Sequence, residues 1–159
     1  MIPVLLFVGA FTVMEGVSYA THRWVMHGPA IGWHRSHHAP PRGRLERNDL
    51  FPVCFSALGV ALFLLAAAGW RHVWWVALGV TAYGAAYLFV HEVYIHRRVA
   101  VPRPTSRYLD WLRASHRVHH MSGDEPYGML LPFVRRPKAT SESGADLLDR
   151  RNRCARPRL

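Results

Sequence analysis

The sequence predicts an all-α integral membrane protein with about three transmembrane helices and a cytoplasmic, histidine-rich helical cap. Two observations predict this fold class: the apolar residues fall in long blocks, and histidines and arginines fill the segments between them. Of 159 residues, 50% are hydrophobic and 19% are charged, which excludes a disordered chain. This length suggests one domain, without room for a separate cofactor domain.

Three apolar segments are candidates for membrane spans: Ile2 to Ala20, Phe51 to Gly69 and Val73 to Val90. As helices at about 1.5 Å per residue, each would be roughly 28 Å long, which is enough to cross a bilayer. Glu15 is the one charged residue in them. The alternative, three buried core helices, would leave little polar surface in so short a chain. The spans also carry small residues that favour close helix packing, including Gly9, Gly16, Gly79 and Gly84.

The arginines predict the topology. Residues 21–50 hold five basic residues and residues 91–159 hold fourteen, whereas the short link between the second and third spans holds Arg71 alone. By the positive-inside rule, both basic regions are cytoplasmic, and the N-terminus and the Arg71 link lie outside. We therefore expect a multi-pass protein of the cell inner (plasma) membrane.

The chain divides into a membrane domain over residues 1–137 and a basic tail over 138–159. The tail is rich in Arg, Ser, Asp and Pro and has little apolar periodicity, so it is predicted to be disordered. Basic segments beside spans typically contact anionic lipid, and no nucleic-acid partner is expected. Cys54 and Cys154 form no CxxC pair, which argues against zinc fingers, iron–sulfur sites and disulfide scaffolds.

Ten of the eleven histidines form a pattern of HxxxxH followed by HxxHH, used twice. Positions i, i+3 and i+4 share a helix face, so each HxxHH triplet is predicted to point at one spot. Positions i and i+5 are about 140° apart on an ideal helix, so each HxxxxH pair needs a helix end or a distorted turn to converge. The blocks adjoin the cytoplasmic ends of the spans. They are His22 and His27; His34, His37 and His38; His91 and His96; and His116, His119 and His120.

These ten imidazoles suit two metal ions with four to six ligands each. Neutral imidazole binds iron, zinc, copper and nickel, and iron with open coordination positions suits oxygen chemistry. Zinc would replace iron on purification, because it binds nitrogen sites more tightly than Fe(II). The alternatives are a bis-histidine haem protein, a metal carrier or sensor, and histidines that contact lipid headgroups, as expected for His72.

Four residues are candidates for supporting the metal ligands. Glu15 lies seven residues before His22 on the same helical face and is predicted to accept the second N–H of a ligand imidazole. Tyr87, four residues before His91, is predicted to act in the same way. Asp49 and Glu92 are further candidates. The alternative for each is a polar residue at the membrane interface.

The histidine blocks and their surroundings resemble the membrane fatty-acid hydroxylase and sterol desaturase superfamily and, within it, the bacterial β-carotene hydroxylase family. The resemblance covers about residues 10–135. It rests on Met14-Glu15, His22-Arg-Trp-Val-Met-His27-Gly28, Trp33-His34-Arg35-Ser36-His37-His38, Asn48-Asp49-Leu50, Thr81-Ala82-Tyr83-Gly84, His91 to Arg97, and Ala114-Ser115-His116-Arg117-Val118-His119-His120.

This resemblance implies that the ten histidines hold a non-haem di-iron centre, with no catalytic residue separate from the metal ligands. The implied reaction is O₂-dependent hydroxylation of carotenoid β-ionone rings at C3, from β-carotene to β-cryptoxanthin and zeaxanthin. The polyene would lie among the spans, and the candidates for its walls are Phe51, Phe55, Tyr83 and Phe89. Alternatives are a hydroxylase or desaturase of another membrane lipid, a carotenoid ketolase, and a non-catalytic membrane metal-binding protein.

The electrons are expected from an external donor, because the chain has no GxGxxG, CxxC or flavin-binding pattern. A ferredoxin or a similar acidic protein would suit the basic surface near the histidines. The arginines of that surface are Arg97, Arg98, Arg103, Arg107 and Arg113. Anchoring on lipid is the alternative role for each of them.

Overall fold

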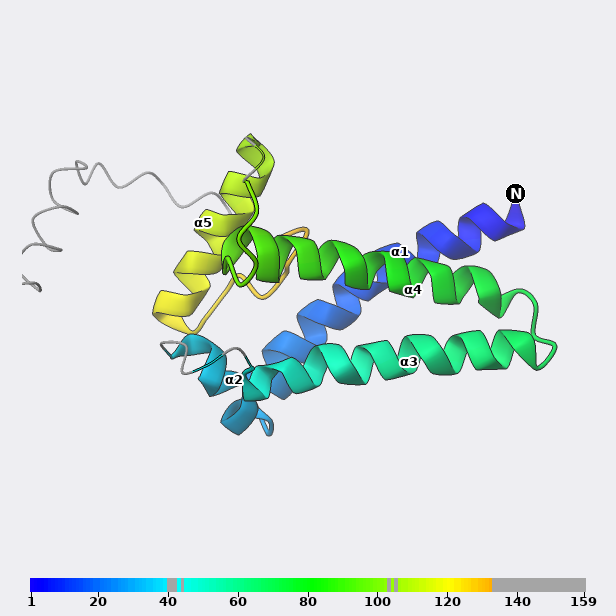
Figure 1. Ribbon diagram of the computed structural model, residues 1–159, viewed down its shortest axis with the longest axis horizontal. Helices are drawn as coiled ribbons and strands as arrows, with labels where there is room; N and C mark the ends of the chain where they lie inside the picture. Colours follow the sequence, from blue (N-terminus) through cyan, green and yellow to red (C-terminus); the bar gives the residue numbers. More distant parts are fainter. Residues whose placement is uncertain (40–42, 44, 103, 105, 133–159) are drawn as a thin grey trace, which may run out of the picture.

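The computed structural model describes residues 1–39, 43, 45–102, 104 and 106–132, and within them every regular element is helical (Figure 1). Three helices consist almost entirely of apolar residues: α1 (Ile2–Ala20), α3 (Leu50–Ala67) and α4 (Val73–Leu88). Two others are α2 (Ile31–His38) and α5 (Arg107–Ser122). The all-α prediction is confirmed, whereas the predicted disordered tail lies outside the described residues.

Three short helices complete the fold. Two are π-helices, η1 (Thr21–Met26) and η3 (Phe89–Ile95), which continue α1 and α4 without a break. The 3₁₀ turn η2 (Arg47–Asp49) leads into α3. With these extensions, the three helices long and apolar enough to cross a membrane are Ile2–Met26, Arg47–Ala67 and Val73–Ile95.

The surfaces of these three helices are apolar and largely uncovered. In the most apolar stretch of each, 11%, 17% and 28% of the residues are buried inside the protein. Large side chains such as Val4, Leu5, Val53 and Leu64 are exposed. A water-soluble protein would bury such residues, so these faces belong against lipid and the three helices are not core helices of a soluble domain.

Helix α4 packs against both α1 and α3. The turn between α3 and α4 contains Gly69 at φ 116°, a backbone conformation that favours glycine. Helix α1 approaches α4 closely at Gly79, where an added methyl group would lie 2.5 Å from the carbonyl oxygen of Phe7. The predicted packing role of glycine is therefore confirmed at Gly79, whereas Gly9, Gly16 and Gly84 face open space.

The end of α1, the start of α3 and the end of α4 lie at the same end of the bundle, beside α2 and α5 (Figure 1). The N-terminus and the turn between α3 and α4 lie at the opposite end. Helix α5 begins at Ser106, whose side chain accepts a hydrogen bond from Leu109 N, and ends at Gly123 at φ 74°.

Residues 123–132, here called the return loop, run back from α5 against the spans. Leu130 packs on a core cluster that includes Met14 and Tyr83, and Met129 packs in a second cluster with Val90 and Leu112. The return loop thus joins α5 to the bundle.

Candidate metal centre

In each HxxxxH pair the first histidine lies in a π-helix and the second is the C-cap residue of that helix. The backbone N–H of His27 donates to the carbonyl oxygen of His22 at 3.1 Å, and that of His96 donates to His91 at 2.9 Å. These i+5 to i hydrogen bonds define a π-helix, whose wider turn brings residues five apart onto one face. The ring centroids are 5.2 Å apart in the His22–His27 pair and 4.6 Å apart in the His91–His96 pair. The predicted distorted turn is therefore confirmed in both blocks.

The first cluster of histidines gathers side chains from η1, α2 and α5. Each member offers a ring nitrogen, and these nitrogens all lie within 4.8 Å of one another. The shortest Nε2–Nε2 distances are 3.0 Å between His34 and His38 and 3.1 Å for both His22–His34 and His27–His119. The first cluster is His22, His27, His34, His38 and His119.

The second cluster gathers side chains from η3, α2 and α5. The nitrogens of His37, His96, His116 and His120 lie within 4.8 Å of one another. The ring of His91 lies against three of them, at centroid distances of 4.6 Å to His37, 4.6 Å to His96 and 4.8 Å to His116. We count His91 with the second cluster for this reason.

The structure corrects the prediction for the HxxHH triplets, because neither triplet points at a single spot. His34 and His38 join the first cluster, while His37 joins the second. In the same way, His116 and His120 join the second cluster, while His119 joins the first. Positions i+3 and i+4 diverge by about 100° around a helix, on opposite sides of position i. Each of α2 and α5 lies between the two clusters and contributes ligand candidates to both.

Neutral oxygen atoms orient three rings of the first cluster through their Nδ1 atoms. His22 Nδ1 donates to the carbonyl oxygen of Tyr127 at 3.0 Å, and His119 Nδ1 donates to that of Asp124 at 2.6 Å. His34 Nδ1 donates to Asn48 Oδ1 at 2.8 Å. A carbonyl oxygen can only accept, so each Nδ1 carries the hydrogen and each Nε2 keeps a lone pair for a metal ion.

In the second cluster, carboxylates face the Nδ1 atoms of two rings. His37 Nδ1 lies 3.3 Å from Glu46 Oε2, and His91 Nδ1 lies 2.6 Å from Glu92 Oε1. Glu92 is itself paired with Arg98, at 2.9 Å, and Arg98 makes a two-pronged pair with Asp49 at 2.5 and 2.8 Å. Such pairs fix the tautomer of a ligand imidazole and raise its basicity.

The donor set fits metal ions that prefer nitrogen. Because both Nδ1 atoms donate elsewhere, the lone pairs of His22 Nε2 and His34 Nε2 face each other at 3.1 Å, an arrangement that a cation between them stabilises. The Nε2 atoms of His37 and His120 are buried and have no hydrogen-bond partner among the described residues. Burial is also the main reason that the pKa falls to about 3 for His34, His96 and His120 and to about 4 for His119. Neutral imidazoles of this kind bind transition metals.

The structure places two of the predicted supporting residues differently. The carboxylate of Glu15 accepts hydrogen bonds from the hydroxyl of Tyr83 and from backbone N–H groups of the return loop, and among the described residues it contacts no imidazole. The prediction was wrong because the return loop, distant in sequence, lies against this face of α1. Tyr87 stacks its ring on His91, at a centroid distance of 5.1 Å, and no hydrogen bond joins the two among the described residues. The other two candidates, Glu92 and Asp49, form the chain of contacts behind His91.

Four orienting groups were not predicted. Asn48 belongs to the Asn48-Asp49-Leu50 element, so the resemblance contained a signal for it. Glu46 is the one acidic residue among the arginines that precede α3, a weaker signal. The remaining two groups are the backbone carbonyls of Asp124 and Tyr127. Every residue has such a group, so the residue types gave no signal for them.

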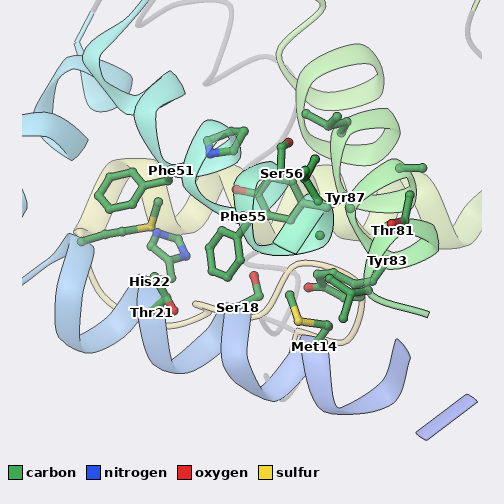
Figure 2. A pocket seen from close by; sticks show the side chains of 18 of the residues that line it. Met14, Ser18, Thr21, His22, Phe51, Phe55, Ser56, Thr81, Tyr83 and Tyr87 are labelled. Atoms are coloured by element: carbon green, nitrogen blue, oxygen red, sulfur yellow. The ribbon is translucent and has the colours of Figure 1, made fainter. Parts of the chain in front are cut away.

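An apolar pocket of about 380 Å³ lies between α1, α3 and α4 and reaches the first cluster at His22. Figure 2 shows Phe51, Phe55 and Tyr83 around this pocket together with His22. Three of the four predicted wall residues therefore line it. Phe89 does not, and its side chain is 43% exposed. Phe89 begins the π-helix η3, which changes the rotation of side chains about the helix axis after Leu88.

A helical membrane bundle with two histidine clusters at one end of an apolar pocket defines the class of membrane-bound, metal-dependent oxygenases. Comparison with known protein families gives the same class. The fatty acid hydroxylase family model matches residues 7–137, and the chain belongs to this family. It is therefore a hydroxylase, an oxidoreductase.

Three relatives illustrate the similarity. The chain is 38% identical to the beta-carotene hydroxylase of Paracoccus sp. (strain PC1), over 84% of this chain and 83% of the relative. It is 42% identical to the beta-carotene hydroxylase of Pseudescherichia vulneris, over 67% and 61%. It is 37% identical to the chloroplastic beta-carotene 3-hydroxylase of an Oncidium hybrid cultivar, over 78% of this chain and 43% of that protein. No solved structure matches the chain.

Proposed function

We propose that this hydroxylase acts on carotenoids, at C3 of the β-ionone ring, and that two iron ions held by the histidine clusters supply its oxygen chemistry. One atom of O₂ enters the ring C–H bond, and the other leaves as water with two electrons from an external donor and two protons from the solvent. β-Carotene would yield β-cryptoxanthin and then zeaxanthin. The observation that carries the proposal is the position of His22, which belongs to the first cluster and also lines the apolar pocket.

The two clusters suggest which histidines serve which ion. One ion would be held by His22, His27, His34, His38 and His119. The other would be held by His37, His91, His96, His116 and His120. Neither set contains a thiolate or a carboxylate, which excludes calcium and magnesium as natural occupants. Zinc would compete for both sets during purification.

The pocket supports a carotenoid as the substrate class. Its volume of about 380 Å³ suits one ring with the first part of a polyene, rather than a whole carotenoid. Its walls are mostly apolar, and its aromatic side chains come from α3 and α4. They are Phe51, Phe55, Phe63, Tyr83 and Tyr87. These walls would exclude water and hold the ring against His22, while the remainder of the polyene stays in lipid.

The distribution of charge supports the orientation and the electron donor. The clusters share one end of the bundle with the basic segments, whereas Arg71 lies at the other end, so we place the clusters on the cytoplasmic face of the plasma membrane. Arg97 and Arg107 are exposed near the clusters and suit an acidic ferredoxin or similar donor. Arg98 and Arg113 are engaged with carboxylates of this chain, and Arg103 lies outside the described residues.

The test is expression in a bacterium that accumulates β-carotene, with pigment analysis by liquid chromatography and mass spectrometry. The expected products carry one or two hydroxyl groups at ring C3. His37→Ala and His38→Ala should both abolish them, each through a different cluster. An exposed histidine outside both clusters offers the control, and His72→Ala should leave the products unchanged.

Other outcomes identify the alternatives. A ketone at the ring would indicate a ketolase. Unchanged pigment with iron in the purified protein and oxygen consumption on another lipid would indicate a hydroxylase or desaturase of that lipid. Bound metal without oxygen consumption on any lipid would indicate a non-catalytic metal-binding protein.

A further inference from the structure

Glu15 is a buried carboxylate in the first span that the proposed metal centre does not use. It is 6% exposed and lies in the second half of α1. A carboxylate at such a position is costly and usually functional. Its role therefore needs an explanation from its contacts.

The carboxylate is held by four groups. Oε1 accepts hydrogen bonds from the backbone N–H groups of Met129 at 3.0 Å, Leu130 at 3.1 Å and Leu131 at 2.9 Å. Oε2 accepts one from the hydroxyl of Tyr83 at 2.7 Å. Three successive N–H groups directed at one oxygen form an anion-binding arrangement of the backbone. The return loop is thus folded around the end of this side chain.

Gly128 makes this wrapping possible. An added methyl group there would lie 3.1 Å from Glu15 Oε1 and 2.6 Å from the carbonyl oxygen of Leu131. The loop therefore approaches the carboxylate as closely as a glycine permits.

The same loop orients the first cluster and not the second. The carbonyl oxygen of Tyr127, two residues before Met129, accepts from His22 Nδ1, and that of Asp124 accepts from His119 Nδ1. In the second cluster, the orienting groups are Glu46 and Glu92, which lie outside the return loop.

We propose that Glu15 is a positioning residue for the first cluster: it holds the return loop in place, and the loop carbonyls in turn hold His22 and His119 in the orientation that binds a metal ion. The part that concerns the metal rests on the proposed function. A merely structural Glu15 would affect both clusters equally when removed, whereas a positioning residue affects the first cluster alone.

The test compares Glu15→Leu and Glu15→Gln with wild type, and uses Thr12→Val, a polar position on the same helix, as the matched control. Two quantities are measured on protein purified in lipid nanodiscs and reconstituted with ferrous iron. One is the number of iron ions per chain, with Mössbauer spectra to distinguish the two sites. The other is hydrogen exchange of the backbone amides in residues 127–131.

Wild type and Thr12→Val should bind two ions, whereas Glu15→Leu should bind one and lose a single Mössbauer component. Exchange at residues 129–131 should rise about tenfold or more in Glu15→Leu, because the hydrogen bonds to Oε1 are lost. Exchange in α2 and η3 should stay unchanged. Glu15→Gln keeps one oxygen acceptor, so it should fold, with smaller changes in the same places.

Three results would overturn the proposal: unchanged loop exchange in both variants, two ions retained in Glu15→Leu, or equal loss from both sites in Glu15→Gln. If Glu15→Leu does not fold, the glutamine variant decides alone. Wild type without bound iron would contradict the proposed function instead, and the exchange measurement would still decide whether Glu15 holds the loop.

Discussion

Glu92→Gln tests how strongly a carboxylate behind a histidine would stabilise the metal ion proposed for the second cluster. In the structure, His91 Nδ1 lies 2.6 Å from Glu92 Oε1, and the side chains are 2% and 13% exposed. Glutamine keeps the size and the acceptor oxygen but removes the charge. The hydrogen bond therefore remains while its charge-assisted part is lost.

The expected magnitude follows from the two kinds of hydrogen bond. A bond to a charged group contributes about 1.5–3 kcal/mol and a neutral one about 0.5–1.5 kcal/mol. The difference of about 1–1.5 kcal/mol corresponds to roughly tenfold weaker metal binding. Glu92→Leu removes the acceptor altogether and should weaken binding by about 10- to 100-fold, the usual effect of losing such a partner.

The assay measures iron per chain by mass spectrometry after equilibration with a graded series of chelator concentrations. Half of the iron should leave Glu92→Gln at about tenfold lower chelator concentration, and the other half should leave as in wild type. Asp110→Asn is the matched control, because Asp110 pairs with Arg113 and Tyr94 and, among the described residues, has no hydrogen bond or ion pair with a histidine. Release that is unchanged, or shifted equally for both halves, would refute the reasoning.

Three further predictions concern packing, the pocket and pH. Gly79→Ala should destabilise the protein by about 1–3 kcal/mol, because its methyl group would meet the Phe7 carbonyl, while Gly84→Ala should be neutral or stabilising in the same detergent melting experiment. Phe55→Trp should fill the pocket and lower turnover of β-carotene, whereas Phe89→Trp, on the exposed surface, should leave turnover unchanged. Metal-free protein should melt at progressively lower temperature as the pH falls from about 6.5 to about 3. Burial lowers the pKa of clustered histidines such as His96 in the folded state. Over this pH range the unfolded chain therefore binds more protons than the folded protein, and the folded state loses stability. A melting temperature that rises over this range would contradict the last prediction.

Local spacing predicted those features that depend on one helix at a time. The spans follow from apolar length, and the need for a distorted turn follows from placing His22 and His27 five residues apart. The division of each triplet between two clusters did not follow from spacing. It depends on how α2 and α5 lie relative to each other, and that is decided by packing among segments far apart in the chain.

The supporting contacts were harder to predict for two physical reasons. Glu15 and its partners in the return loop are separated by 114 to 116 residues, so no local pattern connects them. The acceptors for His22 and His119 are backbone carbonyls, which every residue possesses. Phe89 was misassigned because its aromatic residue type does not show which side of a helix faces the pocket.

The division of the triplets has a consequence for the order in which the enzyme matures. One ion would join η1, at the end of α1, to both α2 and α5, and the other would join η3, at the end of α4, to the same two helices. Together the two ions of the proposed centre would tie these four segments into a ring beside His22, which lines the pocket. A newly inserted chain without metal would lack this closure, so its pocket mouth would have no fixed width. Metal loading would then precede substrate capture, and an immature chain would leave the carotenoids of its membrane untouched.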